Sequence, residues 1–339
     1  MKRFTQLKRM FHSYQNYRSR KSRNIPLPIR LWIEPSSVCN LSCVMCLNKD
    51  LAKSEKGFMD FDVFKKIIDE ASCFVYDVNL FHRGESLLHP EIFKMIKYAK
   101  DKGLSTRLNT NATLLDNERS YQIFESGLDF LSFSFDGYER RVYEKIRKGA
   151  DFRKTLDNII RFLSIKKQLH KNFPYTTFTV IKFSDGLLGE VKEDIEKQFI
   201  KKFDSLPLNQ FVTRAPHNWA GGYNSKNKIS DKSFLPCTFP WYSLTMFWDG
   251  RVVPCPQDFF GKLTLGNVKD SSLLDTWNGS KEIFLREKLS RREYEDIVPC
   301  SRCDRLWRRK LFGVPMVELG RFLKDNLIGY NRSIRKILR

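Results

Sequence analysis

Residues 31–50 read LWIEPSSVCNLSCVMCLNKD and carry three cysteines within eight positions, Cys39, Cys43 and Cys46. The apolar start of this stretch predicts a buried strand, so the cysteines fall in the loop directly after it. Three thiols at this spacing can face one metal centre, and no fourth cysteine lies close by in the sequence. The stretch therefore predicts a metal site with three thiol ligands at the end of a strand.

Two kinds of metal centre suit this pattern. In a cube of four irons each iron needs an outside ligand, so three thiolates leave one iron open to another molecule. Zinc in a structural site prefers four protein ligands, commonly as two CxxC-like pairs. A single CxxxCxxC after a strand favours the iron–sulfur cube, and structural zinc is the alternative.

Strand-like and helix-like stretches alternate about six times along the first two thirds of the chain. This pattern predicts an α/β fold with a parallel sheet, of the size of a partial (β/α)6 TIM-like barrel. In such barrels the chemistry gathers in the loops after the strands. The strand-like stretches are residues 29–35, 75–81, 104–111, 128–134, 176–183 and 208–214.

The cysteine triplet and the barrel pattern together resemble the radical S-adenosylmethionine (SAM) superfamily, over roughly residues 29–215. Met45 departs from the aromatic residue that is commoner at this position in the family. The resemblance implies that the three cysteines hold a [4Fe–4S] cluster whose open iron binds SAM. It also implies reductive cleavage of SAM to a 5′-deoxyadenosyl radical, which abstracts hydrogen from a substrate.

Further family motifs follow the next three strands. Gly84, Glu85 and Ser86 resemble the GGEP-type motif that holds the ammonium group of SAM, although Arg83 stands where the family often has glycine. Amide side chains can donate to and accept from ribose hydroxyls. The remaining residues that the resemblance assigns to SAM binding are Asn109, Asn111, Ser134 and Asp136.

A second cysteine set lies in the last third of the chain. The stretch LTMFWDGRVVPCPQD predicts a β-hairpin turning at Asp249-Gly250. Its surroundings resemble a small SPASM or twitch domain, which carries auxiliary [4Fe–4S] clusters, and four cysteines suffice for one fully ligated cluster. A zinc ribbon is the alternative. The four cysteines are Cys237, Cys255, Cys300 and Cys303.

A fully ligated auxiliary cluster has no iron for substrate, which favours a role in electron transfer. The cluster layout is similar to that of the twitch dehydrogenases, so we expect oxidation of a carbohydrate or cyclitol alcohol. In the loop after the sixth strand, His217 is the candidate base and Arg214 the candidate for orienting the hydroxyl. Cys73 is expected to be a small buried residue at the opposite end of the barrel, which argues against an epimerase.

Two other functions stay open from the sequence. One is maturation of a ribosomally made peptide, although only 38 residues precede Cys39, which predicts no peptide-binding domain within the chain. The other is a zinc-stabilised nucleic-acid-binding protein, suggested by the formal net charge of +21 but by no recognised nucleic-acid fold.

The chain is expected to divide into a basic extension (1–28), a barrel (29–215), a cluster domain (216–306) and a basic tail (307–339). Seven of the eight cysteines lie in short-spaced or turn-flanked groups that suit metal binding, which predicts a reducing cytoplasm. The partners expected are a sugar-like or peptide substrate and a reducing protein such as flavodoxin or ferredoxin. The basic ends suggest either packing on the barrel or peripheral contact with the inner membrane surface. Their apolar residues at helical spacing are Phe4, Leu7, Phe11, Tyr14, Leu319, Phe322, Leu323 and Leu327.

Overall fold

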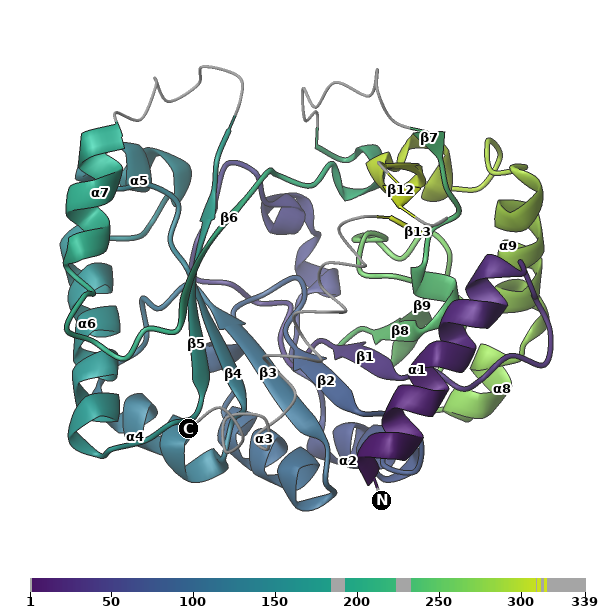
Figure 1. Ribbon diagram of the computed structural model, residues 1–339, viewed down its shortest axis with the longest axis horizontal. Helices are drawn as coiled ribbons and strands as arrows, with labels where there is room; N and C mark the ends of the chain where they lie inside the picture. The colour runs from purple at the N-terminus through teal and green to yellow at the C-terminus, as the bar shows by residue number, and fades with distance from the viewer. Residues whose placement is uncertain (1, 184–192, 224–232, 309, 312–313, 316–339) are drawn as a thin grey trace.

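A computed structural model describes residues 2–183, 193–223, 233–308, 310–311 and 314–315 (Figure 1). Six parallel strands are hydrogen-bonded side by side in chain order, which confirms the predicted partial barrel. The strands are β1 (Arg30–Ile33), β2 (Asp77–Leu80), β3 (Ser105–Thr110), β4 (Phe130–Ser134), β5 (Tyr175–Ile181) and β6 (Gln210–Arg214).

Helices connect these strands and cover one face of the sheet (Figure 1). Sequence signals set their ends: Asp60 accepts hydrogen bonds from the backbone N–H groups of Asp62 and Val63 and so begins the first of them. The helices are α2 (Phe61–Ala71), α3 (Ile92–Asp101), α4 (Asn117–Ser126), α5 (Arg140–Ile146), α6 (Phe152–Gln168) and α7 (Glu193–Lys201).

Alternate residues of the strands have different surroundings. Leu131, Phe133 and Phe178 belong to the buried apolar core under the helices. Their neighbours along the strands, such as Ser132 and Thr177, are only half-buried. Because successive side chains of a strand point to opposite faces, the polar set lies on the concave side of the sheet.

The C-terminal hairpin extends the same sheet. Strand β8 (Ser243–Met246) pairs in parallel with β1, and β9 (Arg251–Val253) and β10 (Gly266–Asn267) follow it in antiparallel order. Gly250 has φ +92°, so the predicted Asp249-Gly250 turn is confirmed. The short remaining strands are β7 (Ser233–Phe234), β11 (Trp307–Arg308), β12 (Lys310–Leu311) and β13 (Val314–Pro315).

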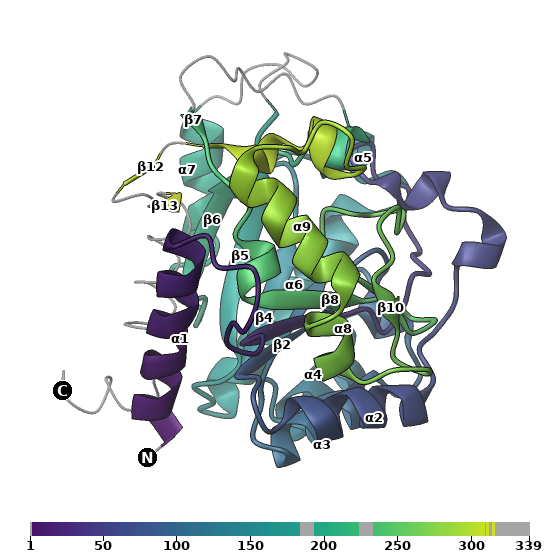
Figure 2. The same ribbon diagram turned by 90° about the vertical axis from the view of Figure 1, so that its right-hand side faces the viewer.

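The N-terminal helix α1 (Lys2–Arg18) lies on the same side of the molecule as α8 (Leu273–Trp277) and α9 (Ser280–Arg291) (Figure 2). The Tyr17 ring is buried against Trp241, at 5.5 Å between centroids, and its hydroxyl donates to the Pro236 carbonyl. Phe11 is 55% exposed. The basic extension thus packs on the C-terminal part through its second half, while the apolar residues of the basic tail lie outside the described residues.

Cys73 lies between α2 and β2, at the amino end of the strands as expected, but it is exposed. The prediction that it is buried is therefore wrong: the turn after α2 directs Phe74 and Val75 into the core and leaves Cys73 at the surface. Across the described part of the chain, no helix has both the length and the apolar character that a membrane span requires.

Candidate active site

The first cysteine loop leaves β1 and is held from two sides. The backbone N–H groups of Ser42 and Val44 donate to the carbonyls of Lys148 and Ile146, at 3.0 and 2.9 Å. The loop then turns back on itself, since Cys46 N–H donates to the Cys43 carbonyl. These bonds fix a loop that has no helix or strand of its own.

The three thiols of this loop share one site. Burial raises the pKa of Cys39 to about 12 and that of Cys43 to about 11, and the charges of the other thiols add to the increase. Burial also raises the pKa of Cys46. Thiolates that are buried away from solvent need a strongly positive partner. The donor set therefore fits three corners of a [4Fe–4S] cube.

Gly84 lies directly under this loop. A Cβ at Gly84 would stand 2.4 Å from the Ser36 carbonyl oxygen and 2.5 Å from that of Val38. No side chain fits there, so glycine is required for the close approach of the two loops. Glu85 N–H then donates to the Val38 carbonyl at 2.9 Å, which joins the predicted SAM-binding motif to the cysteine loop.

Glu85 is buried and connects the second and third loops. Its Oε1 accepts from the Thr110 hydroxyl at 2.8 Å, and its Oε2 accepts from Asn111 N–H at 2.7 Å. Burial raises its pKa, and the bonds from Asn111 and Thr110 oppose that rise. Its charge also acts on Cys39, so the carboxylate faces the thiols. Oε2 can accept one further hydrogen bond.

Asn111 ties the third loop to the cysteine loop. Its Nδ2 donates to Asn40 Oδ1 at 2.9 Å, and Asn40 Nδ2 donates to the Thr113 hydroxyl at 2.8 Å. Ser86, which was also predicted to bind SAM, donates its hydroxyl to the Leu80 carbonyl. Asn109 and Ser134 lie half-buried on the strands β3 and β4.

Asp136 holds a cation that the sequence reading missed. Its Oδ2 accepts from Arg147 Nη2 at 2.7 Å, and its Oδ1 accepts from Ile181 N–H. Arg147 is buried, and its charge opposes the rise that burial causes in the pKa of Cys43. Within the described part of the chain its Nε has no hydrogen-bond partner. A residue at the end of α5, far from any motif, gave no local signal for this role.

The four thiols of the second cysteine set also lie close to one another. Cys237, Cys255, Cys300 and Cys303 are all buried. Burial raises the pKa of Cys255 well above its usual value, and the charges of the other three raise it further. Four thiols around one point fit a cluster with every iron ligated.

The described residues contain no group of three or more His, Cys, Asp and Glu side chains placed to hold a single metal ion. In a cube each thiolate binds a different iron, so the thiolates stand further apart than around one zinc ion.

The loop after β6 lies between the two cysteine sets. Asn218 Nδ2 donates to the Arg302 carbonyl at 2.7 Å, and the Trp219 ring meets Phe259 edge-on at 5.2 Å. A Cβ at Gly222 would stand 2.6 Å from Leu47 of the first loop. Trp219 has φ +47°, an unusual conformation for a large side chain. The segment directly after His217 is thus held against both cysteine regions, by Arg302 on one side and Leu47 on the other.

Arg214 is the last residue of β6 and is exposed; its carbonyl accepts from Lys182 N–H at 2.9 Å. The His217 ring lies 6.0 Å from the Trp219 ring at 71°. Both predicted residues therefore lie at or just after the end of β6, on the segment that leads to the contacts of Asn218 and Trp219.

A buried ion pair also joins the two regions. Arg83 donates from Nε and Nη2 to Glu34, both at 2.7 Å, and its Nη1 reaches the Phe259 carbonyl at 3.4 Å. His82 Nε2 lies 2.9 Å from the Pro256 carbonyl, beside Cys255. The arginine that departs from the family's glycine thus fastens the SAM-type loop to the loop after Cys255.

Comparison with known proteins gives the family. The pattern of the Radical SAM superfamily matches residues 33–197, and that of an iron–sulfur cluster-binding domain, SPASM, matches residues 237–304. The chain therefore belongs to the radical SAM superfamily and carries a C-terminal SPASM domain. Its cofactors are SAM and [4Fe–4S] clusters, and the zinc-stabilised nucleic-acid-binding alternative is set aside.

Individual relatives differ in activity. The chain is 25% identical over 356 positions to the tungsten-containing aldehyde ferredoxin oxidoreductase cofactor-modifying protein of Pyrococcus furiosus, covering 86% of this chain and 99% of that protein. It is 32% identical over 182 residues to PqqA peptide cyclase of Bradyrhizobium diazoefficiens, covering 51% of this chain and 47% of that protein. The solved structure of BtrN in complex with AdoMet and 2-DOIA shares the fold, with TM-score 0.56, 17% identity, and coverage of 82% and 93% of the two chains.

Proposed function

We propose that this radical SAM enzyme oxidises an alcohol of a carbohydrate or cyclitol. The complete four-thiol set beside the three-thiol set carries the proposal. Four thiolates leave no iron for substrate, so the auxiliary cluster suits the role of electron acceptor. We assign Cys39, Cys43 and Cys46 to the SAM cluster and the other four to the auxiliary cluster.

The concave face of the sheet supports a hydroxylated substrate. Its half-buried side chains include Asn109, Ser132, Ser134, Thr177 and Thr179. Amide and hydroxyl groups can each donate to and accept from a substrate hydroxyl. Ser132 and Thr179 already form such a hydroxyl pair at 3.0 Å. The hydrocarbon chains of a lipid would present no such groups to this surface.

We assign two charged residues to the binding of SAM, which supplies hydrogen abstraction when it is bound. Glu85 keeps an acceptor position on Oε2 for the ammonium group. Arg147 offers an unpartnered, buried Nε, within the described residues, for the carboxylate. Asp136 holds that guanidinium in place and is thus a positioning residue. Arg147→Lys should weaken SAM binding, because lysine cannot keep the Asp136 bond and present a second donor.

His217 and Arg214 would act on the substrate hydroxyl, the first as base and the second by orienting it. The strained, doubly anchored segment around Trp219 supports a functional role for this loop. His217→Gln should retain SAM cleavage and lose ketone formation, because the hydroxyl proton then has no acceptor.

Iron and sulfide content tests the cluster assignment. Protein purified without oxygen should carry about eight irons, and the Cys39/Cys43/Cys46→Ala variant about four. Replacing the other four cysteines should also leave about four. Zinc without sulfide would contradict both assignments.

Substrate oxidation needs its own test. A panel of cyclitols and amino sugars, deuterated at the carbinol carbon, is incubated with reduced enzyme and SAM. Deuterium should enter 5′-deoxyadenosine, with one ketone formed per SAM consumed. Labelled 5′-deoxyadenosine without ketone would contradict the oxidation.

Peptide modification is the second candidate. The similarity to PqqA peptide cyclase, 32% over 182 residues, favours it. This candidate would replace the first if a peptide triggers SAM cleavage and is recovered cross-linked or with two hydrogens fewer, while no alcohol reacts.

A further inference from the structure

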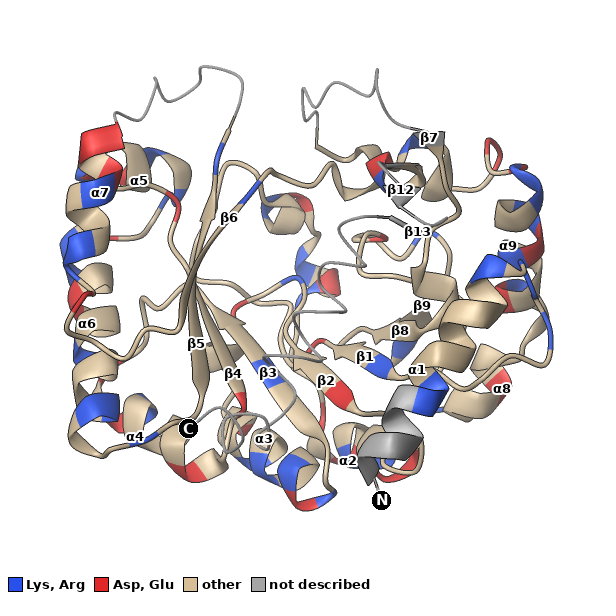
Figure 3. Ribbon diagram, in the orientation of Figure 1, with Lys and Arg blue, Asp and Glu red and all other residues tan. Residues whose placement is uncertain are grey.

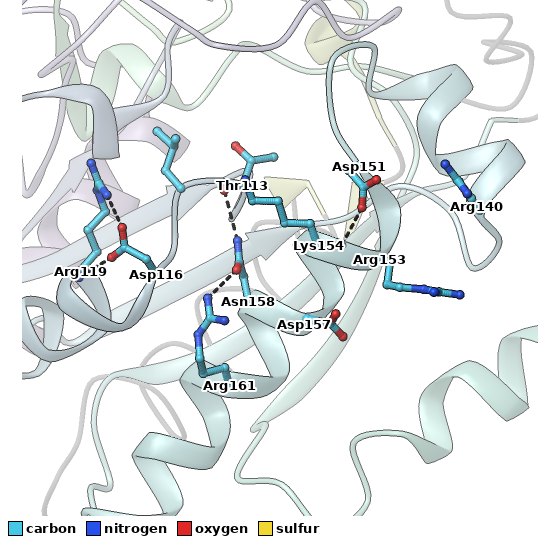
Figure 4. Close-up of a pocket in the computed structure, with 11 residues that line it drawn as sticks. Thr113, Asp116, Arg119, Arg140, Asp151, Arg153, Lys154, Asp157, Asn158 and Arg161 are labelled. Atoms are coloured by element: carbon cyan, nitrogen blue, oxygen red, sulfur yellow. Dashed lines mark hydrogen bonds and ion pairs between the residues drawn. The ribbon is translucent and has the colours of Figure 1, made fainter.

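A pocket of about 800 Å³ opens on the outer side of the barrel, where α4 and α6 begin (Figure 4). Five cationic and three acidic side chains line it. The cations are Arg119, Arg140, Arg153, Lys154 and Arg161, and the acids are Asp116, Asp151 and Asp157. None of them belongs to the motifs that bind SAM or hold the cysteines.

This basic pocket adjoins the first cysteine loop. Thr113 lines the pocket and accepts a hydrogen bond at 2.8 Å from Asn40, the exposed neighbour of Cys39. On the other side, Gly149 lies against the loop: a Cβ there would meet Leu41 Cδ2 at 3.4 Å. The pocket therefore lies next to the cysteine loop, joined to it through the Asn40–Thr113 hydrogen bond.

Two of its three acids already have partners, and the five cations outnumber the acids. Asp116 accepts from Arg119 N–H and pairs with the Arg119 guanidinium. Asp151 accepts from Lys154 N–H at 2.7 Å and caps α6, where the helix dipole stabilises negative charge. Arg153 and Lys154 are exposed, and their side chains have no ion-pair partner among the described residues. The outward charge of the pocket is therefore positive.

We propose that the basic pocket docks an acidic one-electron carrier protein, which reduces the cluster at the SAM site. Reductive cleavage consumes one electron, and the carrier leaves oxidised by that electron. The electron breaks the C5′–S bond of SAM, giving methionine and the 5′-deoxyadenosyl radical. Complementary charge speeds such encounters and orients them. On some other helices the two signs of charge alternate: Figure 3 shows basic and acidic segments side by side along α7 and α9. The inference rests on the proposed radical SAM function but not on the substrate.

Charge reversal tests the docking surface. Arg153→Glu/Lys154→Glu changes two exposed side chains of the pocket, and Lys65→Glu/Arg291→Glu makes the same change in net charge on α2 and α9. Asp157→Lys adds charge to the pocket. Binding of purified flavodoxin is measured at low and high salt, together with SAM cleavage driven by flavodoxin and, separately, by dithionite.

The pocket reversal should weaken flavodoxin binding about tenfold at low salt, and high salt should remove most of the difference. Asp157→Lys should tighten binding, and the α2/α9 control should stay near wild type. Dithionite-driven cleavage should be equal in all variants, so its loss everywhere would overturn the proposed function instead. Equal weakening by both reversals, or no weakening by the pocket reversal, would overturn the docking proposal.

Discussion

Two buried glutamate–arginine pairs, one beside each cysteine set, are built in opposite ways. Glu34 accepts two bonds of 2.7 Å from Arg83 and further bonds from the N–H groups of Arg83 and Trp248. Glu282 lies 3.6 Å from Arg286 Nη2, and within the described residues neither of its oxygens has a hydrogen-bond partner. Both carboxylates are fully buried.

The pKa values follow the geometry. Burial would raise the pKa of Glu34, but the bonds from Arg83 and His82 outweigh it and lower that pKa to about 2. Burial raises the pKa of Glu282 to about 8, with only partial opposition from the charge of Arg286. An ion pair in the interior thus keeps its charge only where hydrogen bonds replace the lost water.

The largest effect is expected from breaking the well-bonded pair. Arg83→Met should destabilise the protein by about 3–5 kcal/mol, because it leaves the Glu34 charge buried without its partner. It should also loosen the loop after Cys255, since Arg83 reaches Phe259. Anaerobic urea denaturation measures the first effect, and the EPR spectrum of the auxiliary cluster reports the second.

The matched control for Arg83→Met also removes the negative charge of Glu34. Glu34→Gln/Arg83→Met should recover part of the stability, because no buried charge remains. A double variant as unstable as Arg83→Met would show that packing over the Phe247 ring, 3.7 Å from the guanidinium, matters more than the ion pair.

The stability that depends on the Glu282–Arg286 pair should change with pH. An unfolded Glu282 loses its proton near pH 4.5, and the folded one near pH 8. The contribution of protonated Glu282 to the stability of the fold is therefore intact below pH 4.5 and is lost as pH rises to 8. Glu282→Gln should match wild type near pH 5 and exceed it by on the order of 3 kcal/mol at pH 9.

Anaerobic denaturation at several pH values checks this difference between Glu282→Gln and wild type. Glu34→Gln provides the comparison, because a carboxylate with a pKa of about 2 stays ionised from pH 5 to 9. A pH-independent difference for Glu282→Gln would mean that Glu282 is ionised in the folded protein.

The sequence predicted those features that have a local signature. The six parallel strands and the helices that connect them follow from apolar periodicity, the hairpin from Asp249-Gly250, and both thiol sets from cysteine spacing. These signals work because helix and strand periods and tight turns depend on neighbouring residues.

Contacts between distant segments could not be predicted in this way. The pairing of β8 with β1, the packing of Tyr17 on Trp241, and the Arg83–Glu34 bond join residues up to 224 positions apart. In the sequence, Arg83 could be recognised only as a departure from a family motif. Arg147 could not be distinguished from the many other arginines of this basic chain. Their roles depend on burial and on the direction of a side chain, which spacing along the chain does not give.

The smallest effect is expected from an exposed pair with similar distances. Lys97 Nζ lies 3.0 Å from Asp101 Oδ2 along α3, but the two side chains are 63% and 61% exposed. Lys97→Ala should change stability by less than about 0.5 kcal/mol, because water and salt screen this pair. Denaturation in parallel with Arg83→Met measures the ratio of the two losses. A loss above about 1 kcal/mol would mean that distance outweighs burial, since the bonds of the two pairs differ by only a few tenths of an ångström.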